Sequence, residues 1–418
     1  MRVSAWVLYD LANTVYAATL TFLFTPYCEQ NFGGLTSLGV TQTWSMVLAG
    51  FSVPLLGVII DRTRRTGLYL SIATILCVAA MAGWGISQDK AWMLFCFFIA
   101  NFTYNIGLLF YNSLLPSVAS EQRSGLVSGI GTGVGYFGTI LVLIVLLGIE
   151  PKSRQFELAA AMFLIGALPC LLLVGDRRPK PPASSSKGGY GVAMRGAMTS
   201  LLTTLRELPR HRALLFFLLA NFCLVDVLNT AVLFFGSFTK NVFKQAAQQN
   251  TLVFLGHTYS GEQGLQDFFR LAGLCLNALA LLFGIGLGTL TDRFPLRVMQ
   301  ASGIALLFAL IGGAYFGGNS PLGFMLTLVL LGSFGLSGIW TAGRKIVVLL
   351  APQERIGEYF GLYGITVKLS VIGSTIYAVV KDSAGTKPAM LAQSAQLLLG
   401  LVFLSLVRLP KHRQANAK

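Results

Sequence analysis

The sequence predicts an all-α membrane protein with twelve transmembrane helices in two pseudo-symmetric six-helix bundles. Three observations support this fold class. The chain of 418 residues is 54% apolar and only 11% charged, whereas about a quarter of an average soluble protein is charged. Its apolar residues gather in runs of roughly 20 residues or more, the length that crosses a bilayer. Short motifs of the first half recur, in the same order, in the second half.

The apolar runs give the predicted spans. They lie at about 4–27, 42–60, 67–87, 92–115, 125–148, 157–175, 213–239, 268–290, 297–317, 321–343, 355–380 and 388–407. Apolar residues cover every face of most of these runs, as expected for helices that contact lipid and one another. Glycine is frequent within them and lets helices approach closely. Buried helices of a large soluble core would not account for so many such runs.

The basic residues give a predicted orientation. The chain has 31 Lys and Arg against 16 Asp and Glu, a net charge of +15. Most of the Lys and Arg fall in segments on the side of the two termini, and Arg344 and Lys345 are assigned to one of these segments. Acidic residues divide evenly between the sides. This asymmetry predicts that both termini are cytoplasmic, so the positive charge gives no reason to expect nucleic-acid binding.

A basic segment rich in Pro, Ser and Gly, 176–212, divides the chain. It predicts a cytoplasmic linker between an N-terminal six-helix bundle, 1–175, and a C-terminal one, 213–418. The first apolar run is too long for a signal peptide, contains Asp10 and lacks the small residues of a signal-peptide cleavage site. We therefore expect it to be the first span.

Three motifs repeat across the two halves. Asp10-x-x-Asn13-Thr14 in span 1 matches Asp226-x-x-Asn229-Thr230 in span 7, and Gly57-x-x-x-Asp61-Arg62 matches Gly288-x-x-x-Asp292-Arg293. A proline followed by Glu and Arg precedes both span 5 and span 11. Three matches in order, at similar offsets, indicate an internal duplication, which is the layout of secondary transporters.

These residues resemble the major facilitator superfamily. The stretch from Gly57 to Arg65 is similar to that superfamily's loop motif between spans 2 and 3. Four further stretches resemble its vacuolar-effluxer-like branch, the autophagy-related amino-acid effluxers and their bacterial relatives: Trp6–Asn13, Tyr111–Ala119, Val127–Gly138 and Tyr359–Lys368. The resemblance spans nearly the whole chain. It implies the major facilitator fold and transport of a small solute, with an amino acid as the first candidate. It also implies that the protein is located in a bacterial inner membrane.

The chain departs from the branch at three places. A longer polar segment, 241–267, follows span 7. Leu224 and Val225 replace the usual Tyr-Asn before Asp226, and Gly373 is followed by Ser374 in place of proline.

Charged and amide side chains inside the spans are the candidates for binding substrate or for proton coupling. Charge in a membrane is costly and therefore indicates function. Asp10 and Asp226 each have an asparagine, Asn13 or Asn229, three residues on and on the same helix face. The resemblance implies that spans 1 and 7 line a central cavity. Each pair would bind a substrate ammonium or carry a proton, and the alternative is a clasp between helices.

Lys368 lies about midway through span 11, too deep to reach the membrane surface. Alignment of the two halves places it opposite Tyr136 of span 5. It would bind a substrate carboxylate or another anion, or else form an ion pair with Asp226 or another carboxylate that only neutralises both charges. Span 4 adds polar residues, Asn101, Tyr104 and Asn105, which would bind cargo or join helices by hydrogen bonds.

The loop charges Asp61, Arg62 and Arg65, with Asp292 and Arg293, are predicted to be gating residues. Charges at a helix end can bind the end of a neighbouring helix, and the resemblance implies that the loop Asp holds the cytoplasmic side closed. The alternative is that these charges only set the orientation of the chain.

The predicted function is secondary transport of a small polar or zwitterionic organic solute, an amino acid first, by alternating access, with protons as a candidate coupling ion. The alternatives are export of amphipathic drugs or siderophore-like compounds, and a non-transporting role as a membrane receptor or lipid scramblase. The sequence carries no phosphate-binding loop, catalytic cluster or metal-ligand pattern. We therefore expect no enzyme activity, catalytic residue, cofactor or metal, and a monomer whose partners are its substrate and membrane lipid.

Overall fold

The computed structural model of the chain describes residues 1–32, 36–146, 148–177, 199, 203, 206–246, 251–317, 320–370 and 372–409. Most of the predicted linker, 176–212, lies outside these ranges, so the proposed division at this segment stays a prediction. Within the described ranges, twelve helices are long and apolar enough to cross a membrane. The predicted fold class is therefore confirmed.

The first half of the chain supplies six of these spans. They are Arg2–Cys28, Ser37–Thr63, Thr66–Ile86, Lys90–Ser113, Glu121–Leu146 and Lys152–Leu173. Their main helices are α1 (Arg2–Thr19), α2 (Thr25–Asn31), α3 (Thr36–Thr63), α4 (Thr66–Ile86), α5 (Lys90–Ser113), α6 (Leu115–Val118), α7 (Ser124–Leu141) and α8 (Lys152–Leu173). Short π-helical segments, Leu20–Phe24 and Val142–Leu146, continue α1 and α7.

The second half supplies the other six spans. They are Arg212–Leu233, Gly261–Arg293, Pro295–Gly317, Pro321–Leu350, Gln353–Lys381 and Thr386–Ser405. The helices are α10 (Arg212–Leu233), α11 (Phe235–Ala246), α12 (Gly261–Arg293), α13 (Pro295–Gly312), α14 (Pro321–Phe324), α15 (Gly332–Leu350), α16 (Ile356–Leu369), α17 (Ile372–Ala384) and α18 (Thr386–Ser405). The seventh span ends at Leu233, before the predicted residue 239, because α11 is a separate helix.

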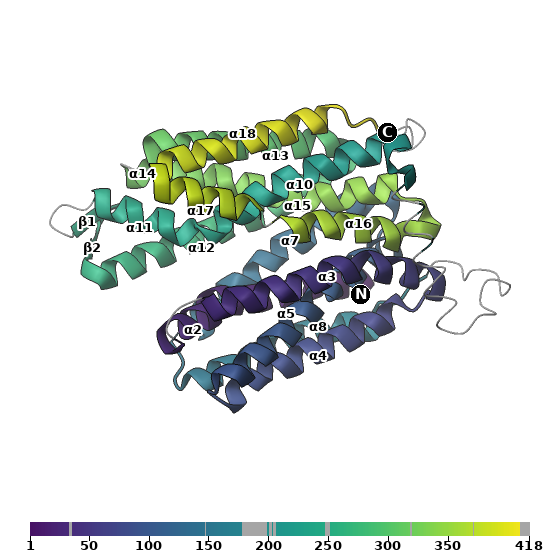
Figure 1. Ribbon diagram of the computed structural model, residues 1–418, viewed down its shortest axis with the longest axis horizontal. Coiled ribbons are helices and arrows are strands. Elements are labelled where there is room, and N and C mark those ends of the chain that lie inside the picture. The colour runs from purple at the N-terminus through teal and green to yellow at the C-terminus, as the bar shows by residue number, and fades with distance from the viewer. Residues whose placement is uncertain are drawn as a thin grey trace.

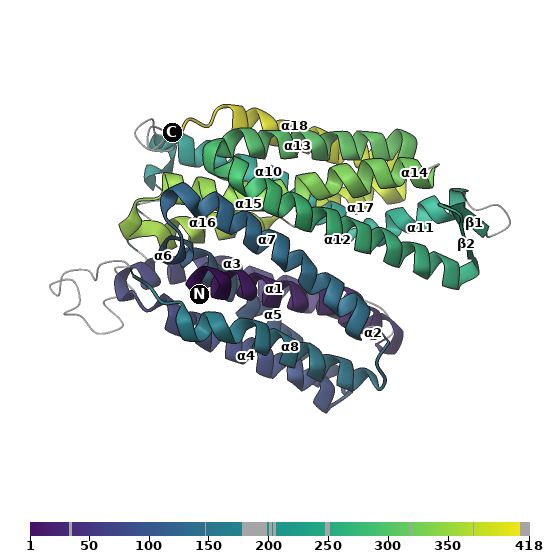
Figure 2. The same ribbon diagram turned by 180° about the vertical axis from the view of Figure 1, so that it is seen from behind.

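The two halves form two bundles that lie side by side, purple to blue and teal to yellow in Figure 1. Between the bundles, α7 packs on α12 and α3 packs on α16. Figures 1 and 2 show both chain termini towards one end of the molecule and the strands β1 and β2 at the opposite end. We call these the terminus end and the hairpin end.

The polar segment expected at 241–267 is not a plain loop. It contains the end of α11, the start of α12 and an antiparallel hairpin of β1 (Thr251–Phe254) and β2 (His257–Ser260). Leu255 and Gly256 form its turn, both with positive φ, which suits a tight two-residue hairpin. Leu252 and Phe254 point into a small apolar cluster with Phe268 of α12, so the hairpin is a packed part of the second bundle.

Candidate functional site

A cavity of about 230 Å³ lies between the two bundles. Helices α1, α3, α5 and α7 line it from the first half, and α15 and α16 line it from the second. Its polar lining consists of charged, amide and hydroxyl side chains: Asp10, Asn13, Thr14, Tyr104, Asn105, Asn112, Thr132, Tyr136, Arg344, Tyr363 and Lys368. A pocket shared by two bundles can open to either side as the bundles move.

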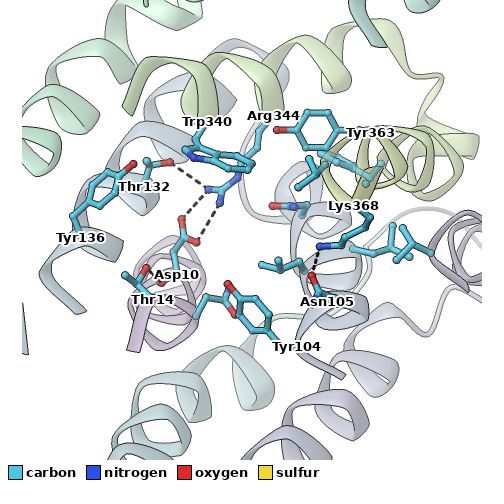
Figure 3. A pocket seen from close by; sticks show the side chains of 18 residues that line it. Asp10, Thr14, Tyr104, Asn105, Thr132, Tyr136, Trp340, Arg344, Tyr363 and Lys368 are labelled. Atoms are coloured by element: carbon cyan, nitrogen blue, oxygen red, sulfur yellow. Dashed lines mark hydrogen bonds and ion pairs between the residues drawn. The ribbon is translucent and has the colours of Figure 1, made fainter. Parts of the chain in front are cut away.

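An ion pair between Asp10 and Arg344 crosses the pocket from one bundle to the other (Figure 3). Arg344 Nη1 lies 2.8 Å from Asp10 Oδ2, and Nη2 lies 3.2 Å from Oδ1. This two-point geometry is the strong form of an Arg–carboxylate pair. Asp10 is 6% exposed and Arg344 7%, so each charge depends on the other for neutralisation.

Three first-bundle side chains support the guanidinium. Its centre lies 5.7 Å from the ring of Trp6 and 5.6 Å from the ring of Tyr111, within cation–π range. Thr132 of α7 accepts a longer hydrogen bond of 3.5 Å from Nη1. Arg344 of the second bundle is therefore held by residues of α1, α5 and α7 in the first.

Lys368 lies on the opposite wall of the pocket (Figure 3). Its ammonium donates to the side-chain oxygen of Asn105 in α5. Among the residues that the structure describes, no carboxylate forms an ion pair with Lys368. The pocket therefore presents a buried cation whose described polar partner is a neutral amide.

Aromatic side chains complete the walls. Tyr104 stacks on Tyr16 with ring centres 4.3 Å apart, and Trp340 stands above the ion pair in Figure 3. The buried hydroxyl of Tyr363 has no hydrogen-bond partner within the described ranges. This hydroxyl lies against the backbone of Gly343 in α15.

The structure brings six of the predicted substrate or proton-coupling residues to this pocket: Asp10, Asn13, Tyr104, Asn105, Tyr136 and Lys368. Lys368 and Tyr136 share the cavity, as the alignment of the halves predicted. Asn101 lies outside the lining. Its amide donates to Ser45 at 2.6 Å, and its oxygen accepts from Tyr16, so it joins helices.

Asp226 and Asn229 are not among the residues that line the pocket. The expectation that span 7 would bring its Asp to the cavity, as span 1 does, is wrong. Asp226 instead faces α17 and α18, where it accepts hydrogen bonds from Gly373 and Gln396. It forms no ion pair with Lys368, whose described partner is Asn105.

Sequence reasoning placed Arg344 and Lys345 in a cytoplasmic segment, and this is wrong. The tenth span runs to Leu350, seven residues beyond its predicted end, and both basic residues are buried in α15. The apolar run Ile346 to Leu350 that follows them was the available signal. A charged pair between two apolar runs indicates a continuing helix better than a loop.

Two aspartates bind helix N-termini across the bundles at the terminus end. Asp61 of α3 accepts from the backbone N–H groups of Gly357 at 2.9 Å and Glu358 at 2.8 Å, in the first turn of α16. Asp292 of α12 accepts from Gly125 at 2.7 Å and Leu126 at 2.8 Å, in the first turn of α7. A carboxylate suits this place because helix N-termini hold unpaired N–H groups and partial positive charge.

The basic residues near these caps differ from the expected set. Arg62 and Arg65 are exposed, whereas Arg64, with its guanidinium 3.7 Å from Asp61, donates to the backbone oxygen of Glu354 at 3.2 Å. In the second half, Arg293 is exposed and stacks on Phe294, while Lys345 pairs with Asp292 at 2.9 Å. Arg64 thus contacts the opposite half through Glu354, and Lys345 does so through the backbone oxygen of Glu121, while its pair with Asp292 lies within its own half.

The backbones themselves meet at this end. A side chain on Gly57 would overlap the carbonyl group of Gly357, and one on Gly288 would lie 3.1 Å from the carbonyl oxygen of Leu126. The bundles can come this close only because glycine has no side chain. The terminus end is therefore tightly closed.

Twelve spanning helices in two related bundles, with a polar pocket between them, define a transporter of the major facilitator type. The chain belongs to the family described as Vacuole effluxer Atg22 like, whose model matches residues 37–417. The family resemblance of the sequence is confirmed.

Relatives and solved structures agree with this class. The chain is 24% identical to "Uncharacterized MFS-type transporter YxiO" of Bacillus subtilis (strain 168), over 97% of this chain and 94% of that protein. The human organic anion transporter MFSD10 (TETRAN) has a similar fold, with a TM-score of 0.69, 17% identity and coverage of 96% and 98%. So does FucP in its outward conformation, with a TM-score of 0.67, 15% identity and coverage of 97% and 98%.

Proposed function

We propose that the chain transports a small organic solute that bears a carboxylate, with an amino-acid zwitterion as the first candidate. Alternating access of the pocket between the two bundles would carry the solute across a bacterial inner membrane. The observation that carries the proposal is Lys368, a buried ammonium in the pocket with an amide as its described polar partner. A carboxylate would neutralise it and accept its hydrogen bonds.

The rest of the pocket suits the other end of an amino acid. The faces of Tyr104 and Tyr136 and the amide oxygen of Asn13 can receive an ammonium group. A volume of about 230 Å³ lies below the roughly 300–1,000 Å³ of pockets that hold drug-sized ligands. The size favours a small metabolite over the amphipathic drugs or siderophore-like compounds of the alternative.

An organic anion without an amine is a second candidate. The pocket contains two cations, Arg344 and Lys368, and one carboxylate, Asp10. Its formal charge is therefore +1, which favours a monoanion over a neutral zwitterion. MFSD10, which has a similar fold, is an organic anion transporter, and this likeness is compatible with such a cargo.

Orientation and coupling are also part of the proposal. The excess of Lys and Arg supports cytoplasmic termini, which makes the closed terminus end the cytoplasmic one. Asp10 is the proposed proton carrier, because a proton on its carboxylate would release Arg344. Counterflow that is indifferent to a pH gradient would contradict this coupling.

Counterflow in proteoliposomes tests the cargo. Pairs of compounds that differ in one group are compared: an amino acid, its analogue without the amine, and its carboxamide. We expect exchange of the amino acid, no exchange of the carboxamide, and at least tenfold slower exchange in Lys368→Met, since a hydrogen bond to a charged group is worth about 1.5–3 kcal/mol. The exposed Lys244 supplies the control, Lys244→Met, which should match the wild type.

Two outcomes decide between the candidates. Faster exchange of the amine-free analogue would make an organic anion the cargo. Equal exchange of the carboxamide and the acid would overturn the role of Lys368 altogether.

A further inference from the structure

Asp226 belongs to α10. In the second bundle this helix packs against α17 and α18 (Figure 1). The residue exposure of Asp226 is 0%, and it does not line the pocket between the bundles. Among the described residues, no lysine, arginine or histidine forms an ion pair with it. A carboxylate buried in this way needs some other source of positive charge.

The helix beside Asp226 is interrupted. α16 ends at Leu369, Ser370 leaves the helical conformation with ψ 55°, and α17 begins at Ile372. The backbone N–H of Gly373, in the first turn of α17, donates to Asp226 Oδ2 at 2.7 Å. A side chain at this position would lie 2.6 Å from the same oxygen, so glycine is what allows the carboxylate to reach the helix end.

The second ligand of that carboxylate comes from α18. Gln396 donates its side-chain amide to Asp226 Oδ2 at 2.6 Å. Gln393, one turn earlier, donates its amide to the carbonyl oxygen of Gly373 at 2.8 Å. The donors to Asp226, Gly373 and Gln396, are both neutral, so within the described residues Asp226 has hydrogen bonds on one oxygen and no compensating cation.

Two oxygens in this cluster have no partner within the described part of the chain: Asp226 Oδ1 and Gln393 Oε1. Gln393 is 1% exposed. Both side chains are hydrogen-bonded to Gly373, Asp226 to its N–H and Gln393 to its carbonyl oxygen, so they meet at one residue. Both are acceptors, so neither can satisfy the other, and leaving both unpaired is costly.

We infer that this cluster is a binding site for a small monovalent cation, Na⁺, with Asp226 Oδ1 and Gln393 Oε1 among its ligands. Carboxylate and amide oxygens are hard ligands that suit such an ion. One carboxylate matches a single positive charge, and no group of three His, Cys, Asp or Glu that would favour a multivalent metal is present in the described ranges. Interrupted helices at the middle of a membrane provide ion sites of this kind in other transporters.

The site is separate from the pocket but connected to it through one helix. Lys368 lies in the last turn of α16, two residues before Ser370, where the helix stops. A cation that fixes the interruption would also fix the position of the Lys368 ammonium in the pocket. Binding of Na⁺ at Asp226 would then favour the arrangement in which Lys368 is presented to the solute.

Thermal unfolding of the purified full chain in detergent tests the site without any transport assay. The apparent Tm is measured in NaCl, KCl and choline chloride at equal ionic strength, at pH 6 and pH 8. We expect Tm to rise with Na⁺ concentration and to saturate, because an ion that binds only the folded protein stabilises it. Asp226→Asn should abolish this rise, and Asp267→Asn, a half-exposed aspartate of α12, should preserve it.

Two results would overturn the inference: equal Tm in all three salts, or a shift that depends on pH but not on Na⁺, which would mean that Asp226 holds only a proton. If Asp226→Asn does not fold, Gln393→Met replaces it and should weaken the Na⁺ midpoint at least tenfold. The comparison of salts in the wild type stands without either variant. Since no solute is involved, failure here leaves the proposed cargo untouched.

Discussion

The two halves of the chain share one device and differ in another. At the terminus end, Asp61 and Asp292 do the same thing, each accepting two backbone N–H groups from the first turn of a helix in the opposite bundle. Inside the membrane, Asp10 and Asp226 occupy matching motifs but different surroundings. Asp10 pairs with Arg344 across the bundles, whereas Asp226 stays within its own bundle.

This difference separates what the repeat conserves from what it does not. Closure needs the same contact on both sides of the pseudo-symmetry axis, because each bundle must be held to the other at two places. A pocket for an asymmetric solute needs different groups on its two walls. The two aspartates at the helix ends, Asp61 and Asp292, therefore have the same role, whereas the two in the interior, Asp10 and Asp226, have different roles.

The largest expected effect comes from Asp10→Asn compared with Asp226→Asn. Asp10→Asn leaves the guanidinium of Arg344 buried without its counter-charge, which costs about 3–5 kcal/mol. Asp226→Asn keeps an oxygen that can accept from Gly373 and should cost less than about 1.5 kcal/mol in Na⁺-free buffer. Apparent Tm in detergent measures both. The double variant Asp10→Asn, Arg344→Gln should regain part of the stability, and equal losses for the two aspartates would refute the contrast.

Next in size is an added methyl group where the bundles touch. Gly284→Ala in α12 would place a Cβ 2.8 Å from the backbone nitrogen of Gly133, and such overpacking costs about 1–3 kcal/mol. Gly286→Ala is the control on the same helix, with no atom within 4 Å of the added carbon. Labelling of a cysteine placed at the terminus end should become faster only in Gly284→Ala. Similar labelling in both variants would show that close backbone contact does not keep this end shut.

A smaller effect is expected from removal of the caps. Asp61→Ala and Asp292→Ala each leave two helix N-terminal N–H groups without their acceptor, at about 0.5–2 kcal/mol. Asp292→Ala should be the more damaging of the two, because the carboxylate of Asp292 lies 2.9 Å from the Lys345 ammonium, whereas that of Asp61 lies 3.7 Å from the Arg64 guanidinium. Apparent Tm ranks the two variants, and a larger loss in Asp61→Ala would contradict the importance of Lys345.

The smallest effect is expected in the hairpin of β1 and β2, which belongs to the second half of the chain. Leu255 is 78% exposed and has φ 49°, a conformation that asparagine adopts more readily than leucine. Leu255→Asn should therefore raise stability by up to about 1 kcal/mol. Transport should not change, since the turn lies far from the pocket lining. A lower Tm would mean that the leucine makes a contact of its own.

The sequence was sufficient for the spans, the repeat and the capping aspartates, because these depend on local hydropathy and on motifs that recur within the chain. It was not sufficient for the pocket. The partner of Asp10 is 334 positions away along the chain, and nothing in the local pattern of α15 says which helix faces it. Asp226 shows the converse. Its motif matches that of Asp10 and predicted a position in the pocket, but its packing against α17 and α18 gives it different surroundings.

Arg344 and Lys345 are neighbours on one helix, yet they serve two different places. Arg344 reaches Asp10 in the pocket, and Lys345 reaches Asp292 and the backbone oxygen of Glu121 at the terminus end. A rigid helix cannot withdraw one of these side chains from the first bundle without moving the other. Whatever frees Arg344, whether solute or proton, thus shares a linkage free energy with the contact that locks the terminus end, and by reciprocity this contact must in turn alter the affinity of the pocket.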